Sequence, residues 1–241
     1  MEKTLIIIPT FNEIENIERL IRAILTIYKS PHILVVDDNS PDLTSEIVLS
    51  LQVEFKENLF LLNRPIKEGL GKAYIDGFKW GLKRDYNYFF QMDADFSHDP
   101  KSLIDLFTSC EFSGNDLAVG SRYIEGINVI NWPISRILLS YFASFYVRTI
   151  TGMPIKDPTA GFICYKRTVL ETLDLDKIKF VGYAFQIEMK FKAFNKKFKI
   201  KEIPIIFTDR VKGESKLTKG IIFEAVSGVI SLKLQQILGK I

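Results

Sequence analysis

Two aspartates one residue apart, Asp93 and Asp95, follow directly on an apolar run that begins at Tyr88. Side chains alternate along an extended backbone, so the two carboxylates point to one side and the small Ala94 to the other. Two hard oxygen ligands at the exit of a buried strand make half of a site for Mg2+ or Mn2+, which keeps further positions for water and substrate phosphates. Acidic residues also commonly end strands and begin turns, so the motif alone leaves both interpretations open.

Length, charge and cysteine content are those of an ordinary globular protein. The 241 residues are expected to form one α/β domain, with a catalytic core over about 1–215 and an amphipathic helical segment over 217–241. A net charge of +3 is too small to indicate a nucleic-acid partner. Cys110 and Cys164 lack metal-ligand spacing and are expected to be buried thiols in a reducing cytosol. We expect neither a signal peptide nor a membrane-spanning helix.

Buried strands alternate with amphipathic helices along the first half of the chain. Strands over 4–9 and 33–38 enclose a helix over 12–28, the order of a right-handed βαβ unit with parallel strands. Later elements are expected as a helix over 43–52, a strand over 59–62, a helix over 71–83, and strands over 88–92 and 116–120. In an open parallel sheet the carboxyl ends of the strands form the ligand crevice, so the polar residues that follow the strands are expected to share one site.

The loops at that crevice favour a nucleotide, but not a dinucleotide site of the Rossmann type. The turn after the first strand reads Pro-Thr-Phe-Asn-Glu and lacks the glycines that let a backbone approach a pyrophosphate. Phe11 can stack near a base, and Glu13 or Asp38 can accept hydrogen bonds from base or ribose groups. Glu13 equally suits the positive end of a helix. Gly69 and Gly71 are explained by a tight turn, with backbone approach to a ligand as the lesser alternative.

In their order along the chain these motifs resemble the nucleotide-sugar glycosyltransferases of the GT-A fold, most closely the polyprenyl (dolichol) phosphate mannose synthases. The resemblance covers nearly the whole chain, and each segment is a weak signal while the ordered set is specific. The matching segments are 9–13, 36–42, 67–73, 92–98, 120–123, Trp132 with Arg136, 157–162 and 210–216. It implies a single GT-A domain with a mostly parallel central sheet flanked by helices.

The resemblance also implies roles for individual residues. Nucleotide-sugar binding, with guanosine as the nucleoside, is implied for Pro9, Phe11, Glu13, Val36, Asp38, Asp93, Ala94, Asp95, Arg122, Arg210 and Lys216. The metal, Mg2+ or Mn2+, is expected on Asp93 and Asp95. Some relatives supply a Gln as a further ligand where this chain has Ser97, so the third protein ligand is left open. Arg122 and Arg136 are candidates for the acceptor phosphate, and the catalytic set is Asp95, Arg122, Arg210 and Lys216.

The resemblance implies an inverting transfer, and chemistry indicates which groups would assist it. Breaking a bond between sugar and diphosphate leaves negative charge on the nucleotide, which a divalent cation together with Arg210 and Lys216 can offset. A polyprenyl phosphate is already an anion, so its attacking oxygen needs no general base. His98 has two interpretations, an outer contact to the metal or a cap on backbone groups, and the second is favoured.

Two apolar segments agree with a lipid acceptor. Residues 133–149 are expected to form a helix with a wide apolar face and interfacial aromatics, suited either to a membrane surface or to packing on the sheet. Residues 217–241 carry a second apolar face with lysines, and relatives with transmembrane segments place them beyond this point. We therefore expect a peripheral enzyme at the cytoplasmic face of a membrane, with a membrane-anchored subunit as a possible partner.

Three functional hypotheses follow. The leading one is transfer of mannose from GDP-mannose to polyprenyl phosphate. The second keeps the fold and moves glucose or another hexose from a UDP- or GDP-sugar, since no hexose-reading residue can be identified from one sequence. The third is a nucleotide-sugar-binding subunit without turnover, and the joint presence of Asp93, Asp95, Arg210 and Lys216 argues against it.

Overall fold

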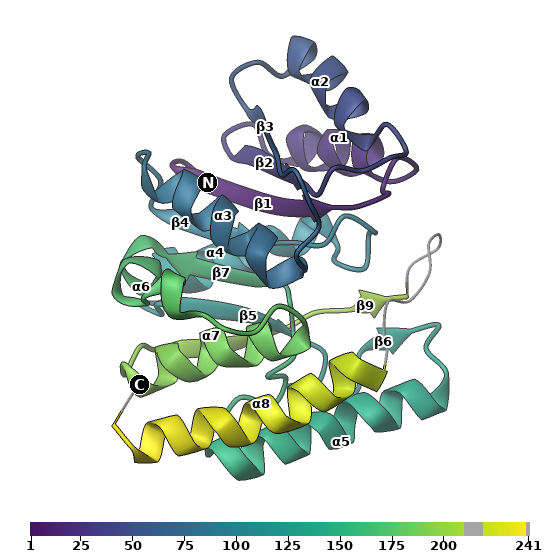
Figure 1. Cartoon of the computed structure of the whole chain (residues 1–241). Coiled ribbons are helices and arrows are strands. Elements are labelled where there is room, and N and C mark those ends of the chain that lie inside the picture. The colour runs from purple at the N-terminus through teal and green to yellow at the C-terminus, as the bar shows by residue number, and fades with distance from the viewer. Residues whose placement is uncertain (210–218, 240–241) are drawn as a thin grey trace.

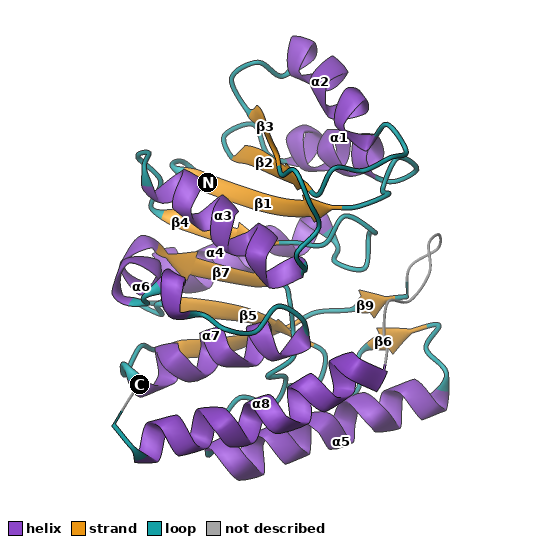
Figure 2. Ribbon diagram, in the orientation of Figure 1, coloured by secondary structure: helices purple, strands orange, loops and turns teal. Residues whose placement is uncertain are grey.

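A seven-stranded, mostly parallel sheet with helices on both faces forms the centre of the protein (Figures 1 and 2). The computed structural model describes residues 1–209 and 219–239. The strand order is β3-β2-β1-β4-β7-β5-β8, and in this sheet only β7 runs against its neighbours. The predicted α/β class and mostly parallel sheet are therefore confirmed, whereas the predicted boundary near residue 215 lies outside the described residues.

The elements of the structure begin and end close to where the sequence patterns place them. The strands are β1 (Thr4–Thr10), β2 (His32–Asp37), β3 (Leu59–Asn63), β4 (Tyr88–Gln91), β5 (Leu117–Ser121), β6 (Val129–Ile130), β7 (Ile163–Lys166), β8 (Ile200–Pro204) and β9 (Phe207–Thr208). The helices are α1 (Ile17–Ile27), α2 (Thr44–Glu54), α3 (Leu70–Leu82), α4 (Leu103–Glu111), α5 (Ile134–Thr151), α6 (Arg167–Thr172), α7 (Tyr183–Asn195) and α8 (Lys219–Ile237), with 3-10 turns η1 (Pro100–Ser102) and η2 (Leu175–Lys177).

The first helix begins five residues later than predicted. Residue 12 was expected to start it, but Asn12 has a φ of +60°, which a right-handed helix does not accept. The backbone carbonyl of Glu13 then accepts from the N–H groups of Asn16 and Ile17. The residues from Asn12 to Asn16 therefore form a turn, and this turn stays at the crevice instead of being drawn into the helix.

Alternation along the strands divides the interior into two cores. Leu5 and Ile7 of β1 pack in the core that contains residues of α3 and α7, and Ile6 and Ile8 pack in the core that contains residues of α1, α2 and α4. Gly71 of α3 lies against α7, and a Cβ atom there would come within 2.8 Å of the Phe185 ring. Gly71 thus serves close packing between helices, which neither interpretation expected, whereas Gly69, with a φ of +105°, forms the turn before α3.

Helix α7 is buried on nearly all sides because it lies between the sheet and two further helices. Phe185 and Met189 pack toward the sheet, while Ile187 and Phe191 belong to a third core with residues of α5 and α8. Helices α5 and α8 run side by side along the edge of the molecule beyond α7 (Figure 1). Within the described residues, no helix has both the length and the apolar character needed to cross a bilayer.

Candidate nucleotide and acceptor site

The predicted crevice is present at the carboxyl ends of the parallel strands. Pro9 and Val36 are register partners near the ends of β1 and β2, and the N–H group of Asp38 donates to the carbonyl of Thr10 at 3.0 Å. Asp93 follows β4, and Arg122 follows β5. Because these strands point the same way, the sheet brings together residues that are more than a hundred positions apart in the chain.

The expected nucleoside end contains a cation over an aromatic ring and a buried ion pair. The Nζ of Lys67 lies 3.6 Å from the centre of the Phe11 ring. Arg64 donates to Asp38 at 2.5 Å and also to Asp76 at 2.8 Å. Burial raises the pKa of the Asp38 carboxyl, and the neighbouring Arg64 opposes that rise. Arg64 was missed by sequence reasoning, because its partners come from other loops and no short motif marks it.

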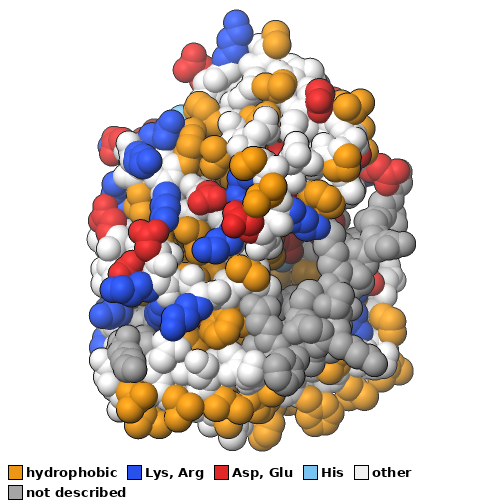
Figure 3. Space-filling view, in the orientation of Figure 1, with side chains coloured by type: hydrophobic (Ala, Val, Ile, Leu, Met, Phe, Trp, Pro, Cys, Tyr) orange, Lys and Arg blue, Asp and Glu red, His pale blue; other side chains and the backbone are white. Residues whose placement is uncertain are grey.

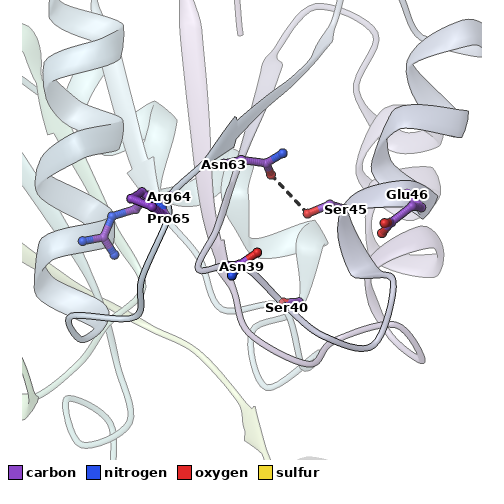
Figure 4. Close-up of a pocket in the computed structure, with 7 residues that line it drawn as sticks. All are labelled: Asn39, Ser40, Ser45, Glu46, Asn63, Arg64 and Pro65. Atoms are coloured by element: carbon purple, nitrogen blue, oxygen red, sulfur yellow. Dashed lines mark hydrogen bonds between the residues drawn. The ribbon is translucent and has the colours of Figure 1, made fainter.

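A pocket of about 340 Å³ lies beside Asp38, between the loops that follow β2 and β3 (Figure 4). Beneath it, the buried Asp37 accepts from the Thr10 hydroxyl at 2.7 Å and from the Ser45 hydroxyl at 2.9 Å. Asp37 therefore ties the ends of β1 and β2 to the start of α2, while the neighbouring Asp38 pairs with Arg64. The pocket is lined by Asn39, Ser40, Ser45, Glu46, Asn63, Arg64 and Pro65.

Glu13, the other carboxylate expected near the nucleoside, lies in the turn before α1. Its side chain accepts from the Asn16 amide at 3.0 Å, and its N–H group donates to the Thr44 hydroxyl at 3.1 Å. Helix α1 begins only at Ile17, so Glu13 is not in its first turn. Its contact with a nucleotide stays a prediction.

The acidic pair occupies a tight turn that the sequence only partly reveals. Asp95 Oδ1 accepts both the N–H group and the hydroxyl of Ser97, at 3.0 and 2.5 Å. Phe96 between them has a φ of +60°, an unfavourable backbone conformation for an aromatic residue that recurs at functional sites. The Tyr74 hydroxyl of α3 donates to Asp93 at 3.4 Å. The two carboxylates are thus held by neighbours on different elements.

His98 caps the backbone, as the favoured interpretation expected. The N–H group of Asp93 donates to His98 Nδ1 at 3.2 Å, and the imidazole stacks on Phe162 with ring centres 4.8 Å apart. Burial lowers the pKa of His98 below its usual value, which agrees with a neutral ring that accepts at Nδ1. His98 therefore positions Asp93.

The donor set at the acidic pair fits a magnesium- or manganese-type ion. The described residues contain no group of three or more His, Cys, Asp or Glu side chains that could hold a metal. The protein would supply the carboxylates of Asp93 and Asp95. The Ser97 hydroxyl donates a hydrogen bond to Asp95. Hard cations that retain waters and substrate phosphates require no fuller protein shell. Ser97 as a third ligand stays a prediction.

Two arginines, one after β5 and one in α5, meet at one indole ring. Trp132 has the guanidinium carbon of Arg122 at 5.3 Å and that of Arg136 at 4.2 Å from its ring centre. Arg122 donates to both oxygens of the buried Asp157, at 2.7 and 2.6 Å, while Arg136 pairs with Asp209 at 2.8 Å. The structure thus brings together the two predicted ligands of the acceptor phosphate. Arg210 and Lys216 lie outside the described residues, so their roles stay predictions.

A buried charged network that sequence reasoning did not identify holds Arg122. Burial works to raise the pKa of Asp157, but the Arg122 guanidinium outweighs it and lowers the pKa. Glu202 accepts the N–H of Asp157 at 2.8 Å and the hydroxyl of Ser121 at 2.7 Å. The fully buried Lys190 of α7 donates to the carbonyls of residues 158, 160 and 186 at 3.0, 2.6 and 3.2 Å. The loop that carries Asp157 is therefore fastened from two sides.

The buried Lys190 gives a testable dependence of stability on pH. Burial lowers its pKa from 10.5 to about 7. Between these pH values the unfolded chain binds one proton more than the folded chain, so this residue makes the free energy of unfolding rise with pH. We expect native protein to gain stability relative to Lys190→Met between pH 7 and pH 10, measured by urea denaturation at several pH values. Parallel curves for the two proteins would contradict the assignment, since all other titrating groups are shared.

Comparisons with known proteins identify a family and several named relatives. Residues 5–174 match the model of the family described as Glycosyl transferase family 2. Polyprenol monophosphomannose synthase of Mycolicibacterium smegmatis is 43% identical over 225 residues, covering 93% of this chain and 84% of the relative. Undecaprenyl-phosphate mannosyltransferase of Micrococcus luteus is 40% identical over 227 residues, covering 94% and 92%. Dolichol-phosphate mannosyltransferase of Pyrococcus furiosus is 36% identical over 236 residues, covering 95% and 63%.

The fold is shared with solved glycosyltransferases. The crystal structure of glucosyl-3-phosphoglycerate synthase from Mycobacterium tuberculosis with Mn2+, UDP and phosphoglyceric acid matches with a TM-score of 0.72, at 14% identity, over 95% of this chain and 78% of that one. The same enzyme with Mn2+, UDP and glucosyl-3-phosphoglycerate matches with a TM-score of 0.69 at 16% identity, over 98% and 80%. At such identity the likeness speaks for the fold alone. With the family match and the close relatives, it shows that the chain belongs to glycosyl transferase family 2 and is a glycosyltransferase of the GT-A fold.

Proposed function

We propose that the protein transfers mannose from GDP-mannose to a polyprenyl phosphate at a membrane surface, with a divalent cation at Asp93 and Asp95. The relatives at 43% and 40% identity are a polyprenol monophosphomannose synthase and an undecaprenyl-phosphate mannosyltransferase. One observation carries the proposal. Arg136 lies in the first turn of α5, the same helix that exposes a long apolar surface, so an anion site and a lipid-compatible surface share one element.

That apolar surface extends over α5 and α8. It appears as a row of hydrophobic side chains along the edge of the molecule where these helices lie (Figure 3). Exposure of so many large apolar side chains on one edge is typical of an interaction surface. Its exposed members are Ile134, Leu138, Leu139, Tyr141, Phe142 and Phe145 of α5, and Val226, Ile230, Leu234 and Ile237 of α8.

In such a transfer, different residues of the site would have different roles. The nucleoside would lie between Phe11 and Asp38, and the diphosphate would lie at the acidic pair. A cation bound there would supply positive charge that offsets the charge developing on the departing nucleotide. Arg122, fixed by Asp157, would hold the acceptor phosphate by charge-assisted hydrogen bonds. Both Asp157 oxygens accept from Arg122, so Asp157 positions that guanidinium, and the anionic acceptor needs no base.

A transfer assay tests the donor and the reaction together. Purified protein is given polyprenyl phosphate in detergent, Mg2+ or Mn2+, and one of GDP-mannose, GDP-glucose or UDP-glucose, and the lipid-linked sugar is separated and counted. We expect product chiefly from GDP-mannose. Greater product from UDP-glucose would replace the proposal by the second hypothesis. Donor binding in calorimetry without product from any donor would support a binding subunit without turnover.

The proposed membrane contact predicts a defect in Phe142→Glu. An interfacial helix combines apolar burial with attraction of basic residues to anionic lipid, so liposome binding should strengthen with anionic lipid and weaken as salt rises. A buried carboxylate in that contact should lower the floated fraction several-fold. Phe112→Glu is a matched control, because Phe112 is an exposed phenylalanine at the end of α4. Equal flotation of native protein and both folded variants would place the contact elsewhere, such as on a membrane-anchored partner at the cytoplasmic face.

A further inference from the structure

Gln186 of α7 is a buried amide for which the structure shows no hydrogen-bond partner. Its side chain is 3% exposed, and neither Oε1 nor Nε2 has a partner among the described residues. Buried polar atoms without partners destabilise the folded state, so native proteins seldom contain them unless water or a ligand completes the bonds. The position of Gln186 in the fold indicates which ligand group this is.

Two separate sets of contacts connect the start of α7, where Gln186 lies, with the acidic pair. A Cβ atom on Gly161 would lie 3.4 Å from Gln186 Nε2, so the amide lies directly beside this glycine. Ile163 pairs with Gln91 in the antiparallel register of β7 and β4. Gly161 lies two residues before Ile163, and Asp93 lies two residues after Gln91. Because the strands are antiparallel, both residues lie at the same edge of the sheet.

The second contact runs through aromatic rings. Phe185, the neighbour of Gln186 in α7, stacks on Tyr74 with ring centres 6.0 Å apart and ring planes within 3° of parallel. The hydroxyl of Tyr74 is the group that donates to Asp93. The start of α7 is therefore linked to the acidic pair through α3 as well as through β7.

The strand order then shows which part of the substrate would meet Gln186. From one side of the crevice to the other, Asp38 follows β2, Phe11 follows β1, Asp93 follows β4, the segment with Gly161 precedes β7, and Arg122 follows β5. In the proposed function these positions correspond to nucleoside, diphosphate and acceptor phosphate, with the β7 position between the last two. The transferred hexose is the group that lies between the diphosphate and the acceptor phosphate in the reaction.

We propose that Gln186 reads the transferred hexose, donating from Nε2 to one sugar hydroxyl and accepting at Oε1 from another. This inference rests on the proposed function and names the residue that recognises its sugar. A neutral amide that both donates and accepts matches adjacent hydroxyls, and it adds no negative charge beside the diphosphate. Lys190, one turn further along α7, holds the carbonyls of residues 158 and 160 and so fixes the loop that leads to Gly161.

Gln186→Met tests the inference, because methionine keeps the length of the side chain and removes both polar atoms. We expect kcat/KM for mannosyl transfer to fall about 10- to 100-fold, the scale of leaving one buried sugar hydroxyl without its hydrogen-bond partner. The Kd of GDP, which lacks the sugar, should stay within twofold of native by calorimetry. The melting temperature should hold or rise, since an apolar group replaces an amide without partners. Ser144→Ala, which removes a buried hydroxyl of α5 without a partner in the described residues, is the control and should leave kcat/KM unchanged.

Donor analogues that lack one sugar hydroxyl separate recognition of the sugar from a structural role, because a structural role would affect all analogues equally. Native enzyme should discriminate against GDP-mannose analogues that lack one hydroxyl, and Gln186→Met should lose that discrimination for the hydroxyl it contacts while retaining it for the others. Unchanged kcat/KM, or an equal loss with every analogue, would overturn the inference while native transfer still upholds the proposed function. Absence of native transfer would instead overturn the proposed function, and calorimetry of GDP-mannose against GDP would then decide whether Gln186 binds the sugar. If Gln186→Met does not fold, Gln186→Glu is measured in the same way.

Discussion

Asp95→Asn should lower mannosyl transfer about a thousandfold, the scale of losing a bound cation that stabilises the charge of the leaving group. EDTA should inactivate native protein to a similar extent, and added Mg2+ or Mn2+ should restore activity. The fold should persist, because the amide oxygen of asparagine can still accept the hydrogen bonds from Ser97 that Asp95 Oδ1 accepts now. Turnover with radiolabelled donor and a thermal melt measure the two effects.

Asp99→Asn provides the matched control for this experiment. Asp99 lies in the same loop, is exposed and caps η1 by accepting from the N–H group of Lys101. Asparagine caps equally well, so activity and melting temperature should both stay near native values. Native turnover that is unaffected by EDTA, together with an active Asp95→Asn variant, would remove the metal from the proposed mechanism.

Asp157→Asn should have the second largest effect, and it should act on both stability and acceptor use. Removing one partner of a buried ion pair leaves the other charge uncompensated, which costs about 3–5 kcal/mol. Because the folded pKa of Asp157 lies below its usual 3.8, this contribution is present at neutral pH and is lost only as pH falls through the folded pKa. Urea denaturation at pH 7 and at pH 3 to 4 measures the difference from native protein.

Kinetics separate the positioning role of Asp157 from simple destabilisation. A loosened Arg122 should raise KM for polyprenyl phosphate by about tenfold or more, with less change in KM for the donor. Arg122→Met combined with Asp157→Asn removes both charges and should regain much of the lost stability without regaining activity. A double variant that recovers both would show that the pair serves only the fold. Equal changes in both KM values would place Arg122 away from the acceptor.

Much of the fold was predictable because its signals are local. Continuous apolar runs marked the strands of the βαβ unit, and helical spacing marked the helices between them. The site was predictable to the same extent, since Asp93, Asp95, Phe11 and Asp38 each follow a strand whose carboxyl end must lie at the crevice. The start of α1 was wrong by five residues because a positive φ at Asn12 depends on the turn around it, and spacing does not report that.

The groups missed were those whose partners lie far away in sequence. Arg64 carries no motif, yet it pairs with Asp38 and Asp76 from separate elements. Lys190 and Gln186 lie in a helix whose sequence pattern does not distinguish them, and only the packing of α7 against the loop at 157–161 shows their contacts. The burial and pairing of these side chains depend on several elements that pack together, so a short segment of the sequence does not predict them.

The sequence by itself determined the fold class, the crevice and the acidic pair, because strand periodicity and the parallel order of strands place those residues without reference to side-chain contacts. Only the tertiary structure decided which side chains meet: Arg122 and Arg136 at Trp132, Asp157 beneath Arg122, and the amide of Gln186 beside Gly161. The physical reason is that backbone conformation depends mainly on local sequence, whereas side-chain contacts depend on how the elements pack together. Local propensity sets where a strand runs and ends, whereas the pairing of buried charges and amides depends on close packing between elements far apart in the chain.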